Sequence, residues 1–397
     1  MKLTPLSLLA ALFLSVGTQA ADGPANGGGV GPGVPPFTVR DGYRVTLAAE
    51  NFGEARHIEL GDDGTLYVTQ PQSKSVAALK DKDGDGLYET HATFLKGIKD
   101  GEGLAFDGGW LYVTSSADGS TIRAKDTNGD GIADVREIYL PRNSVPPGGG
   151  HAYRGIVFTK DYVFITVSDP TNMLEELPSD RKCIYRFNRD GSGKMQFATG
   201  IRNTEKIRLR PGTEEIWGLD HGSDNFGQTY GEKRGDQPVT DLLPGEELNK
   251  FEEGKFYGHP FISNNRIVRP EFAKRPDILE LARKTTPPEW TFGAHWAPNG
   301  FCFLTTDKFP GEKGDMYAAF HGSWNSSLRV GYCIERVLFD QTTGQPYGAL
   351  PIVSTLQPGT NGGVLDRPVD CCEAADGTVL FSCDGKNKIY RISPVAK

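Results

Sequence analysis

The sequence of 397 residues has little that would hold it in a membrane or on a nucleic acid. Its longest apolar run, residues 6–16, has only 11 residues, and these are too few to span a bilayer. The 43 Lys and Arg residues form no dense stretch, and the net charge is −8. Phosphate-binding surfaces need clustered positive charge. We therefore expect neither a membrane anchor nor a nucleic-acid partner.

The N-terminal end predicts export. Lys2, the apolar run and the small-residue site Thr18-Gln19-Ala20 follow the pattern of a signal peptide over residues 1–20. We expect a secreted protein, either extracellular or periplasmic. Residues 21–40 are rich in Gly and Pro and are typical of a linker or disordered leader. Residues 41–397 then form a single domain.

Cysteine is scarce but present, and an exported chain can form disulfides. At least one disulfide is therefore predicted, although the sequence does not choose the pair. No histidine motif lies beside a cysteine, so we expect no catalytic thiol. The six residues are Cys183, Cys302, Cys333, Cys371, Cys372 and Cys383.

One pattern recurs six times: two short apolar β segments separated by a tight Asp/Gly or charged turn. Further strand-like runs follow the hairpins, and the period of roughly 45 to 60 residues is typical of propeller blades. We predict an all-β fold, a six-bladed β-propeller with long loop excursions, the longest over residues 220–290. A tandem β-sandwich would not explain six hairpins in phase. The copies span residues 55–69, 101–114, 153–166, 204–219, 298–320 and 368–382.

The residues just before the first strand of each blade should meet at one mouth of the central channel. Guanidinium groups gathered there would repel one another unless a polyanion lies among them. The sequence therefore predicts a polyanionic ligand; the alternative is that each arginine pairs with a carboxylate such as Glu205 or Asp370. Four copies supply an arginine: Arg56, Arg154, Arg202 and Arg367.

Four histidines are candidate bases at the same mouth, because an imidazole with a pKa of about 6.5 accepts a proton at neutral pH. His151 and His295 stand at the level of the arginines, and His221 and His321 follow second strands. The residues alone do not choose among them.

Two acidic turns have the spacing of calcium loops, with Gly at the sharp turn. Neither has flanking helical patterns, so we expect structural calcium rather than EF-hands; two plain acidic turns at blade edges are the alternative. Ala92 stands where the second turn should have its bidentate Glu. The predicted ligands are Asp126, Asn128, Asp130 and Glu137 in the first turn and Asp81, Asp83 and Asp85 in the second.

Together these motifs resemble the soluble quinoprotein sugar dehydrogenases that use pyrroloquinoline quinone (PQQ), especially the L-sorbosone dehydrogenase and fungal pyranose dehydrogenase branch. The likeness covers about residues 42–393. Order and spacing make it specific, although each segment alone is weak. The matching segments are residues 149–158, 163–172, 199–203, 220–222, 247–249, 256–260, 294–298, 321–325 and 366–369.

The resemblance implies that PQQ, with its three carboxylates, is the polyanion. His151 then looks like the base that takes the hydroxyl proton of a sugar while hydride passes to the quinone, and Arg202 like the group that polarises the quinone oxygens. The carbonyls of Gly222 and Ser223 match the place of a Ca²⁺ that acts as Lewis acid. The remaining implied cofactor contacts are Arg56, Arg154, Asn203, His221, His295 and Arg367.

The chain stops after the propeller, so we expect an external electron acceptor such as a cytochrome. The sugar stays open between an aldose, a pyranose and a keto-aldose. One rival is a calcium-dependent lactonase-type hydrolase on the same fold, whose mouth should be acidic. The other is a non-catalytic binding propeller, which would not require four arginines to converge.

Overall fold

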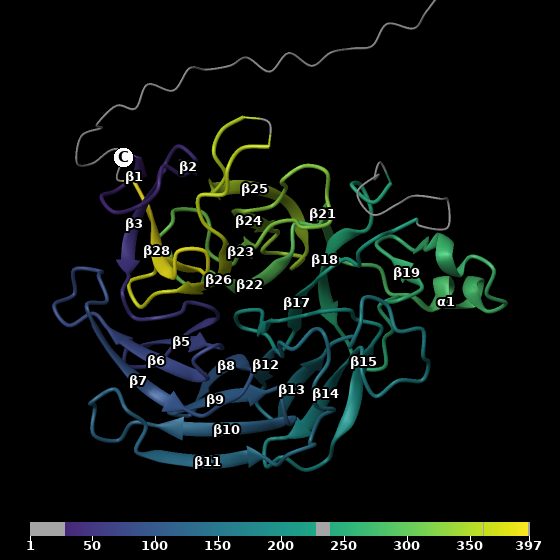
Figure 1. Ribbon diagram of the computed structural model, residues 1–397, viewed down its shortest axis with the longest axis horizontal. Helices are drawn as coiled ribbons and strands as arrows, with labels where there is room; N and C mark the ends of the chain where they lie inside the picture. The colour runs from purple at the N-terminus through teal and green to yellow at the C-terminus, as the bar shows by residue number, and fades with distance from the viewer. Residues whose placement is uncertain (1–27, 228–238, 360, 396–397) are drawn as a thin grey trace, which may run out of the picture.

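Six β-sheets surround one axis in the computed structural model, which describes residues 28–227, 239–359 and 361–395 (Figure 1). The six-bladed propeller prediction is confirmed, and each predicted hairpin forms the two innermost strands of one blade. The predicted signal peptide lies outside the described residues.

The first three blades each take four consecutive antiparallel strands. Blade 1 holds β4 (Ile58–Leu60), β5 (Leu66–Gln70), β6 (Ser75–Lys80) and β7 (Thr90–Lys96). Blade 2 holds β8 (Gly101–Asp107), β9 (Trp110–Ser115), β10 (Ser120–Lys125) and β11 (Val135–Leu140). Blade 3 holds β12 (Ile156–Phe158), β13 (Tyr162–Val167), β14 (Cys183–Asn188) and β15 (Met195–Thr199).

The other three blades draw strands from more distant parts of the chain. Blade 4 holds β16 (Ile207–Leu209), β17 (Ile216–Asp220), β18 (Gly245–Phe251) and β21 (Trp290–Ala294). Blade 5 holds β22 (Pro298–Phe303), β23 (Met316–Phe320), β24 (Cys333–Phe339), β25 (Pro346–Ser354) and β2 (Thr38–Val39). Blade 6 holds β26 (Pro368–Glu373), β27 (Val379–Cys383), β28 (Lys388–Pro394), β3 (Tyr43–Ala49) and β1 (Gly29–Val30).

The inner strands are apolar on both faces because a blade packs against a neighbour on each side. In β5, Leu66 and Val68 enter the core shared with blade 6, whereas Tyr67 between them enters the core shared with blade 2. Alternating side chains of one strand thus join two cores. This is why the repeats show nearly continuous apolar runs.

The N-terminal segment closes the ring, which corrects the prediction that residues 21–40 are only a leader. β3 pairs antiparallel with β28, β1 pairs with β3, and β2 pairs with β25. Phe37 is buried in the core of blades 5 and 6. Although this segment is rich in Gly and Pro and has few apolar side chains, its backbone hydrogen bonds to β3 and β25 hold it in place.

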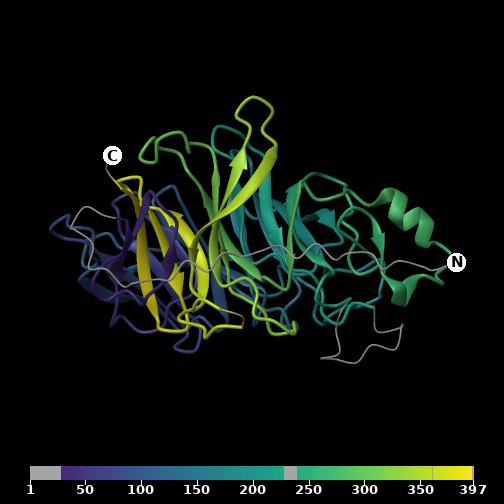
Figure 2. The ribbon, with the colours of Figure 1, turned by 90° about the horizontal axis from the view of Figure 1, so that it is seen from above.

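The predicted excursion 220–290 is only partly loop. It contains β18, the third strand of blade 4, and a side unit of β19 (Ile262–Ser263), β20 (Ile267–Val268), a 3₁₀ turn (Pro270–Phe272) and helix α1 (Ile278–Lys284). This unit projects from one end of the molecule (Figures 1 and 2). Residues 228–238 of the excursion lie outside the described part.

The disulfide prediction is wrong. All six cysteines lie in the described residues and are buried free thiols. Cys371 packs with Cys302 and Cys383 in the core of blades 5 and 6, whereas Cys372 points into the core of blades 6 and 1. A free cysteine packs in a buried strand as a small apolar side chain, so these positions do not require a disulfide.

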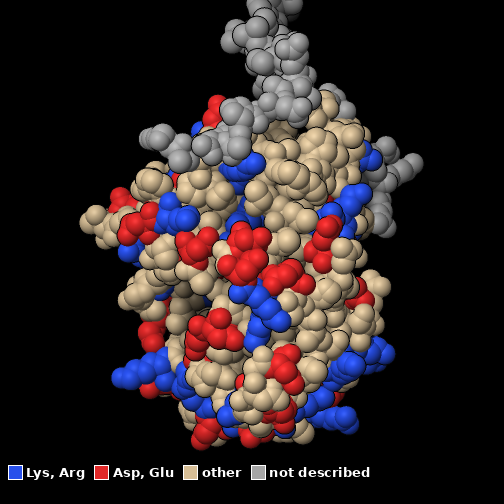
Figure 3. Space-filling model, turned by 90° about the vertical axis from the view of Figure 1, so that its left-hand side faces the viewer, with Lys and Arg blue, Asp and Glu red and all other residues tan. Residues whose placement is uncertain are grey.

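The surface has mixed charge. Acidic and basic side chains are interspersed over the side that carries β3 and β7, with no extended basic patch on that side (Figure 3). Among the described residues, no helix is both long and apolar enough to cross a membrane.

Candidate active site

A cavity of about 310 Å³ opens on the propeller axis, where the chain enters or leaves the inner strands. The innermost strands contact one another from β22 through β26, β4, β8 and β12 to β16, so loops far apart in sequence converge here. Arg56 precedes β4, Arg367 precedes β26, and His321 follows β23. Other lining residues include His151, Arg202, Asn203, Glu205, His221, Gly222, Asp224, Glu246, His295, Asn299 and Trp324.

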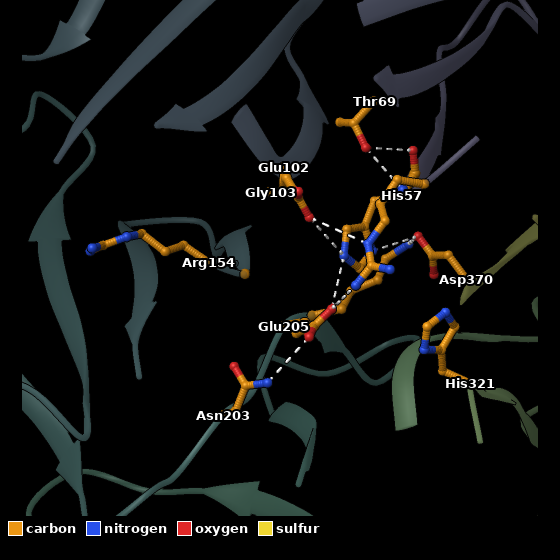
Figure 4. A network of polar contacts seen from close by, with 12 residues as sticks. His57, Thr69, Glu102, Gly103, Arg154, Asn203, Glu205, His321 and Asp370 are labelled. Atoms are coloured by element: carbon orange, nitrogen blue, oxygen red, sulfur yellow. Dashed lines mark hydrogen bonds and ion pairs between the residues drawn. The ribbon is translucent and has the colours of Figure 1, made fainter. Parts of the chain in front are cut away.

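Most predicted cofactor contacts therefore share this cavity, but Arg154 does not. Its guanidinium donates to the carbonyl oxygens of Pro146, at 2.5 Å, and Gly148, and points away from His57 and Glu205 (Figure 4). The side chain is buried, with 2% of its surface exposed. Arg154 does precede the inner strand β12, as predicted, but its side chain turns outward and holds the loop of residues 146–148.

Carboxylates pair with the arginines that do line the cavity. Arg56 donates to Asp384 at 2.8 Å and to Glu205 at 3.2 Å. Arg202 lies 3.2 Å from Asp224. The alternative left open by the sequence, that the arginines pair with carboxylates, therefore holds for Arg56 and Arg202, and the cavity carries charges of both signs.

His151 has the geometry of a base. Its Nδ1 atom lies 2.7 Å from the backbone carbonyl oxygen of Asp169. A carbonyl only accepts, so Nδ1 carries the hydrogen and the lone pair of the neutral ring stands on Nε2. Burial lowers the pKa of His151, and the nearby charge of Arg202 lowers it further. The ring is thus held neutral and ready to accept a proton at neutral pH.

The carbonyl that orients His151 belongs to a strongly anchored residue. The Asp169 carboxylate accepts from the amides of Thr171 at 2.7 Å and Leu174 at 2.8 Å, and lies 2.8 Å from His259 Nε2. Although burial opposes it, these contacts hold the pKa of Asp169 below its usual range. The Asp-x-Thr pattern signals this turn in the sequence, whereas nothing local pointed to His259.

The other three histidines are engaged differently. His295 donates from Nε2 to the Thr240 carbonyl at 2.6 Å, with Nδ1 3.8 Å from Asp224. His321 has Nε2 3.0 Å from Asp384 and accepts at Nδ1 from Arg367 at 2.9 Å. Burial lowers the pKa of His221 to about 4. Both nitrogens of His321 have partners, whereas His151 keeps an accepting nitrogen at the cavity.

A pocket of carboxylates lies beside the predicted cation position. The Gly222 amide donates to Glu246 at 2.6 Å, and the Ser223 hydroxyl contacts Arg269. Burial raises the pKa of both Glu246 and its neighbour Glu247 to about 8. Buried carboxylates next to backbone carbonyls are a donor set that suits a hard cation such as Ca²⁺.

Both acidic turns differ from the predicted ligand sets. In the first, Asp126 accepts the amides of Asn128, Gly129 and Gly131, which shapes the loop. Glu137 does not face it: the side chain lies in β11 and pairs with Arg123 of β10 at 2.6 Å. Because residue 137, the twelfth of the loop pattern, belongs to strand β11, its side chain points to the neighbouring strand and not into the loop, as it would in an EF-hand.

In the second turn, carboxylate oxygens of Asp81, Asp83 and Glu89 lie within 4.8 Å of one another. Glu89 was missed because it stands three places before the expected Ala92. Asp85 instead caps the Leu87 amide at 2.8 Å.

The fold and the site together define a six-bladed β-propeller with a charged cavity on its axis. Residues 34–249, more than half of the chain, match the model of a domain of unknown function, DUF7133, and the chain belongs to that family. Residues 273–394 match the TrAA12-like model.

Similarity in sequence to known proteins covers part of the chain, whereas similarity in structure covers about nine tenths of it. An uncharacterized protein of Borreliella burgdorferi is 28% identical over 263 residues, which are 64% of this chain and 62% of that protein. The match thus leaves more than a third of that relative uncovered.

Two solved structures resemble nearly the whole propeller. The holo PQQ domain of pyranose dehydrogenase from Coprinopsis cinerea matches with a TM-score of 0.76 at 18% identity, over 92% of this chain and 100% of that one. The Trichoderma reesei protein of carbohydrate-active enzymes family AA12 matches with a TM-score of 0.75 at 19% identity, over 90% and 97%, and a calcium structure of it also matches. At these identities the likeness establishes the fold.

Proposed function

We propose that the protein is a PQQ-dependent sugar dehydrogenase in which His151 is the general base. The observation that carries the proposal is the tautomer of His151, fixed by the Asp169 carbonyl, with Nε2 left to accept a proton in a cavity lined by arginines. The match to a PQQ domain of the same fold supports the choice of cofactor.

The lining residues fit a planar molecule with several carboxylates. Arg56, Arg202 and Arg367 offer guanidinium forks that suit carboxylates, and Asn203 adds an amide. A volume of about 310 Å³ lies within the usual range of cofactor pockets. When bound, PQQ would supply the quinone carbonyl that accepts hydride. Gly222 and Ser223 would hold the accompanying Ca²⁺ through their carbonyl oxygens.

The chain's own residues would handle the proton and the orientation of the sugar. His151 Nε2 takes the hydroxyl proton, and Asp169 keeps the ring from turning. Arg202 adds positive charge next to the site where negative charge develops. Trp324 lines the cavity and is 61% exposed, so its ring borders the entrance through which a sugar must pass.

The wider setting completes the proposal. The protein is exported, oxidises an aldose, pyranose or keto-aldose, and passes its electrons to an external acceptor such as a cytochrome. Structural Ca²⁺ binds at the Asp126 turn and at the Asp81 turn, the latter with Glu89 as an additional ligand.

The test is reconstitution of the apoprotein with PQQ and Ca²⁺, followed by dye reduction with a panel of sugars. Saturable quinone binding and sugar-dependent dye reduction are expected. A flat titration together with no dye reduction would overturn the proposal.

A hydrolase on the same fold is the second candidate, because Glu205, Asp224 and Glu246 also line the cavity. Such a site would use a metal-bound water and no quinone. Hydrolysis of lactones by the calcium-loaded protein, with no effect of PQQ, would favour this function instead.

A further inference from the structure

Below the cavity, the propeller axis holds a second, smaller space lined by charged groups. Its walls are formed by His57, Glu102, Glu205 and Lys206 together with backbone of the inner strands. The space accessible inside it, about 10 Å³, is that of a single water molecule. Glu205 lines both spaces and therefore connects them.

Glu102 is the unusual member of this group. It is 1% exposed, and among the described residues its carboxyl oxygens have no well-formed hydrogen bond, with only the side chain of Tyr153 beside them to offer one. Its nearest charges are Arg56 Nε at 3.6 Å and His57 Nε2 at 3.9 Å, with Tyr153 alongside. Burial disfavours the carboxylate more strongly than Arg56, His57 and Tyr153 favour it, so the pKa of Glu102 is raised.

His57 connects Glu102 to the rest of the network. Its Nε2 lies 3.3 Å from Glu205, and its Nδ1 lies 3.5 Å from Asp370, which Lys206 holds at 2.5 Å (Figure 4). Although burial opposes it, the carboxylates of Asp370 and Glu205 raise the pKa of His57. The His57 imidazole thus lies among three carboxyl groups, those of Glu102, Glu205 and Asp370.

We propose that Glu102 and His57 form a proton-exchange site that takes up a proton from solvent when negative charge enters the cavity above. The link is Arg56, which borders the cavity and lies against both Glu102 and Glu205. An anion that competes for Arg56 weakens the positive charge beside Glu102. The carboxyl then binds a proton more tightly, so a proton moves from solvent by way of His57 to the Glu102 carboxylate and stays there as the neutral acid.

The Glu102–His57 site depends on the proposed function in one respect only, namely that the entering anion is PQQ. The charged and titratable groups around Glu102 and His57 come from four blades: Arg56 and His57 before β4, Tyr153 before β12, Glu205 and Lys206 before β16, and Asp370 in β26, which faces His57. Burial raises the pKa of Glu102 to about 8, which leaves the proton exchangeable near neutral pH.

The first test uses the apoprotein and needs no quinone. A group whose pKa is raised by folding contributes stability at low pH and loses it as the pH rises toward the folded value. Glu102→Gln stays neutral, so its Tm should rise relative to the wild type between pH 5 and pH 8. Glu335→Gln removes a buried carboxyl of β24 outside the channel whose pKa burial raises to about 7, so it should show the same trend and serves as the positive control. A Tm difference between Glu102→Gln and the wild type that stays constant with pH would overturn the inference.

The second test measures proton uptake with an indicator dye when PQQ and Ca²⁺ are added to weakly buffered protein at about pH 8, where Glu102 is partly ionised. Wild type and Glu335→Gln should take up a similar amount, and Glu102→Gln clearly less. Equal uptake in all three would overturn the coupling while leaving the dehydrogenase proposal intact. Absence of any quinone binding overturns the proposed function and the coupling, and the apoprotein comparison then still decides whether Glu102 holds a proton.

Discussion

The Nδ1 atom of His151 lies 2.7 Å from the carbonyl oxygen of Asp169, and this contact fixes which nitrogen of the ring can act as a base. Replacing His151 with alanine should therefore lower kcat at least about a hundredfold, as loss of a general base does. Quinone affinity should change little, because the arginines remain. His91→Ala, at an exposed position of β7, is the control. Unchanged turnover in His151→Ala would move the base to another residue.

The pH profile follows from the same ring. His151 accepts a proton only when neutral, and burial together with Arg202 lowers its pKa. The neutral form should persist to lower pH, so kcat/KM should hold across neutral pH and fall only below about 6.5. Arg202→Gln removes the positive charge and should move this acid limb to higher pH. Titration of the His151 ring resonance in the apoprotein measures the shift directly; an ordinary or raised pKa there contradicts the argument.

Free thiols make the fold independent of redox conditions. Each cysteine is buried and unbonded, and burial raises the pKa of Cys372 to about 12. A thiol reagent should leave the native protein unmodified and react with six groups after unfolding. Reductant should leave Tm unchanged. A drop in Tm on reduction would show that a disulfide forms in the protein in solution.

Calcium should stabilise the acidic turn at Asp81 more than the turn at Asp126. Three carboxylates gather within 4.8 Å in the former, and their repulsion is relieved by a cation. Added Ca²⁺ should therefore raise Tm, and Asp83→Asn should reduce that rise by more than Asp130→Asn does. An equal rise in both variants and the wild type would place any bound calcium elsewhere.

Repeats made the fold predictable, because six hairpins in phase constrain the ring more than any single strand does. The same phase predicted that residues before the inner strands converge, and it succeeded for Arg56, Arg202 and Arg367. It failed for Arg154 because register locates a backbone position but not the rotamer. Loop 146–148 offers that guanidinium two carbonyl oxygens, a choice made by tertiary packing.

The sequence also did not show which charged side chains form ion pairs in the fold. Glu205 was one of the carboxylates that the sequence offered as a partner for the arginines, whereas nothing in the sequence assigned Asp224 to Arg202. Glu137 fits a loop spacing, but its strand directs it to Arg123. The role of Asp169 depends on its backbone carbonyl, which every residue has, so no residue type could signal it.

The pairing of β3 with β28 has a consequence for biogenesis. These partners are separated by most of the chain, so blade 6 lacks its outer strands until the two ends of the polypeptide meet. A chain under synthesis therefore carries an unpaired strand edge at β3 until β28 has been made, and such edges invite aggregation. Assembly of the ring is thus postponed to the last moment of synthesis, when a chaperone that shields exposed strands would matter most.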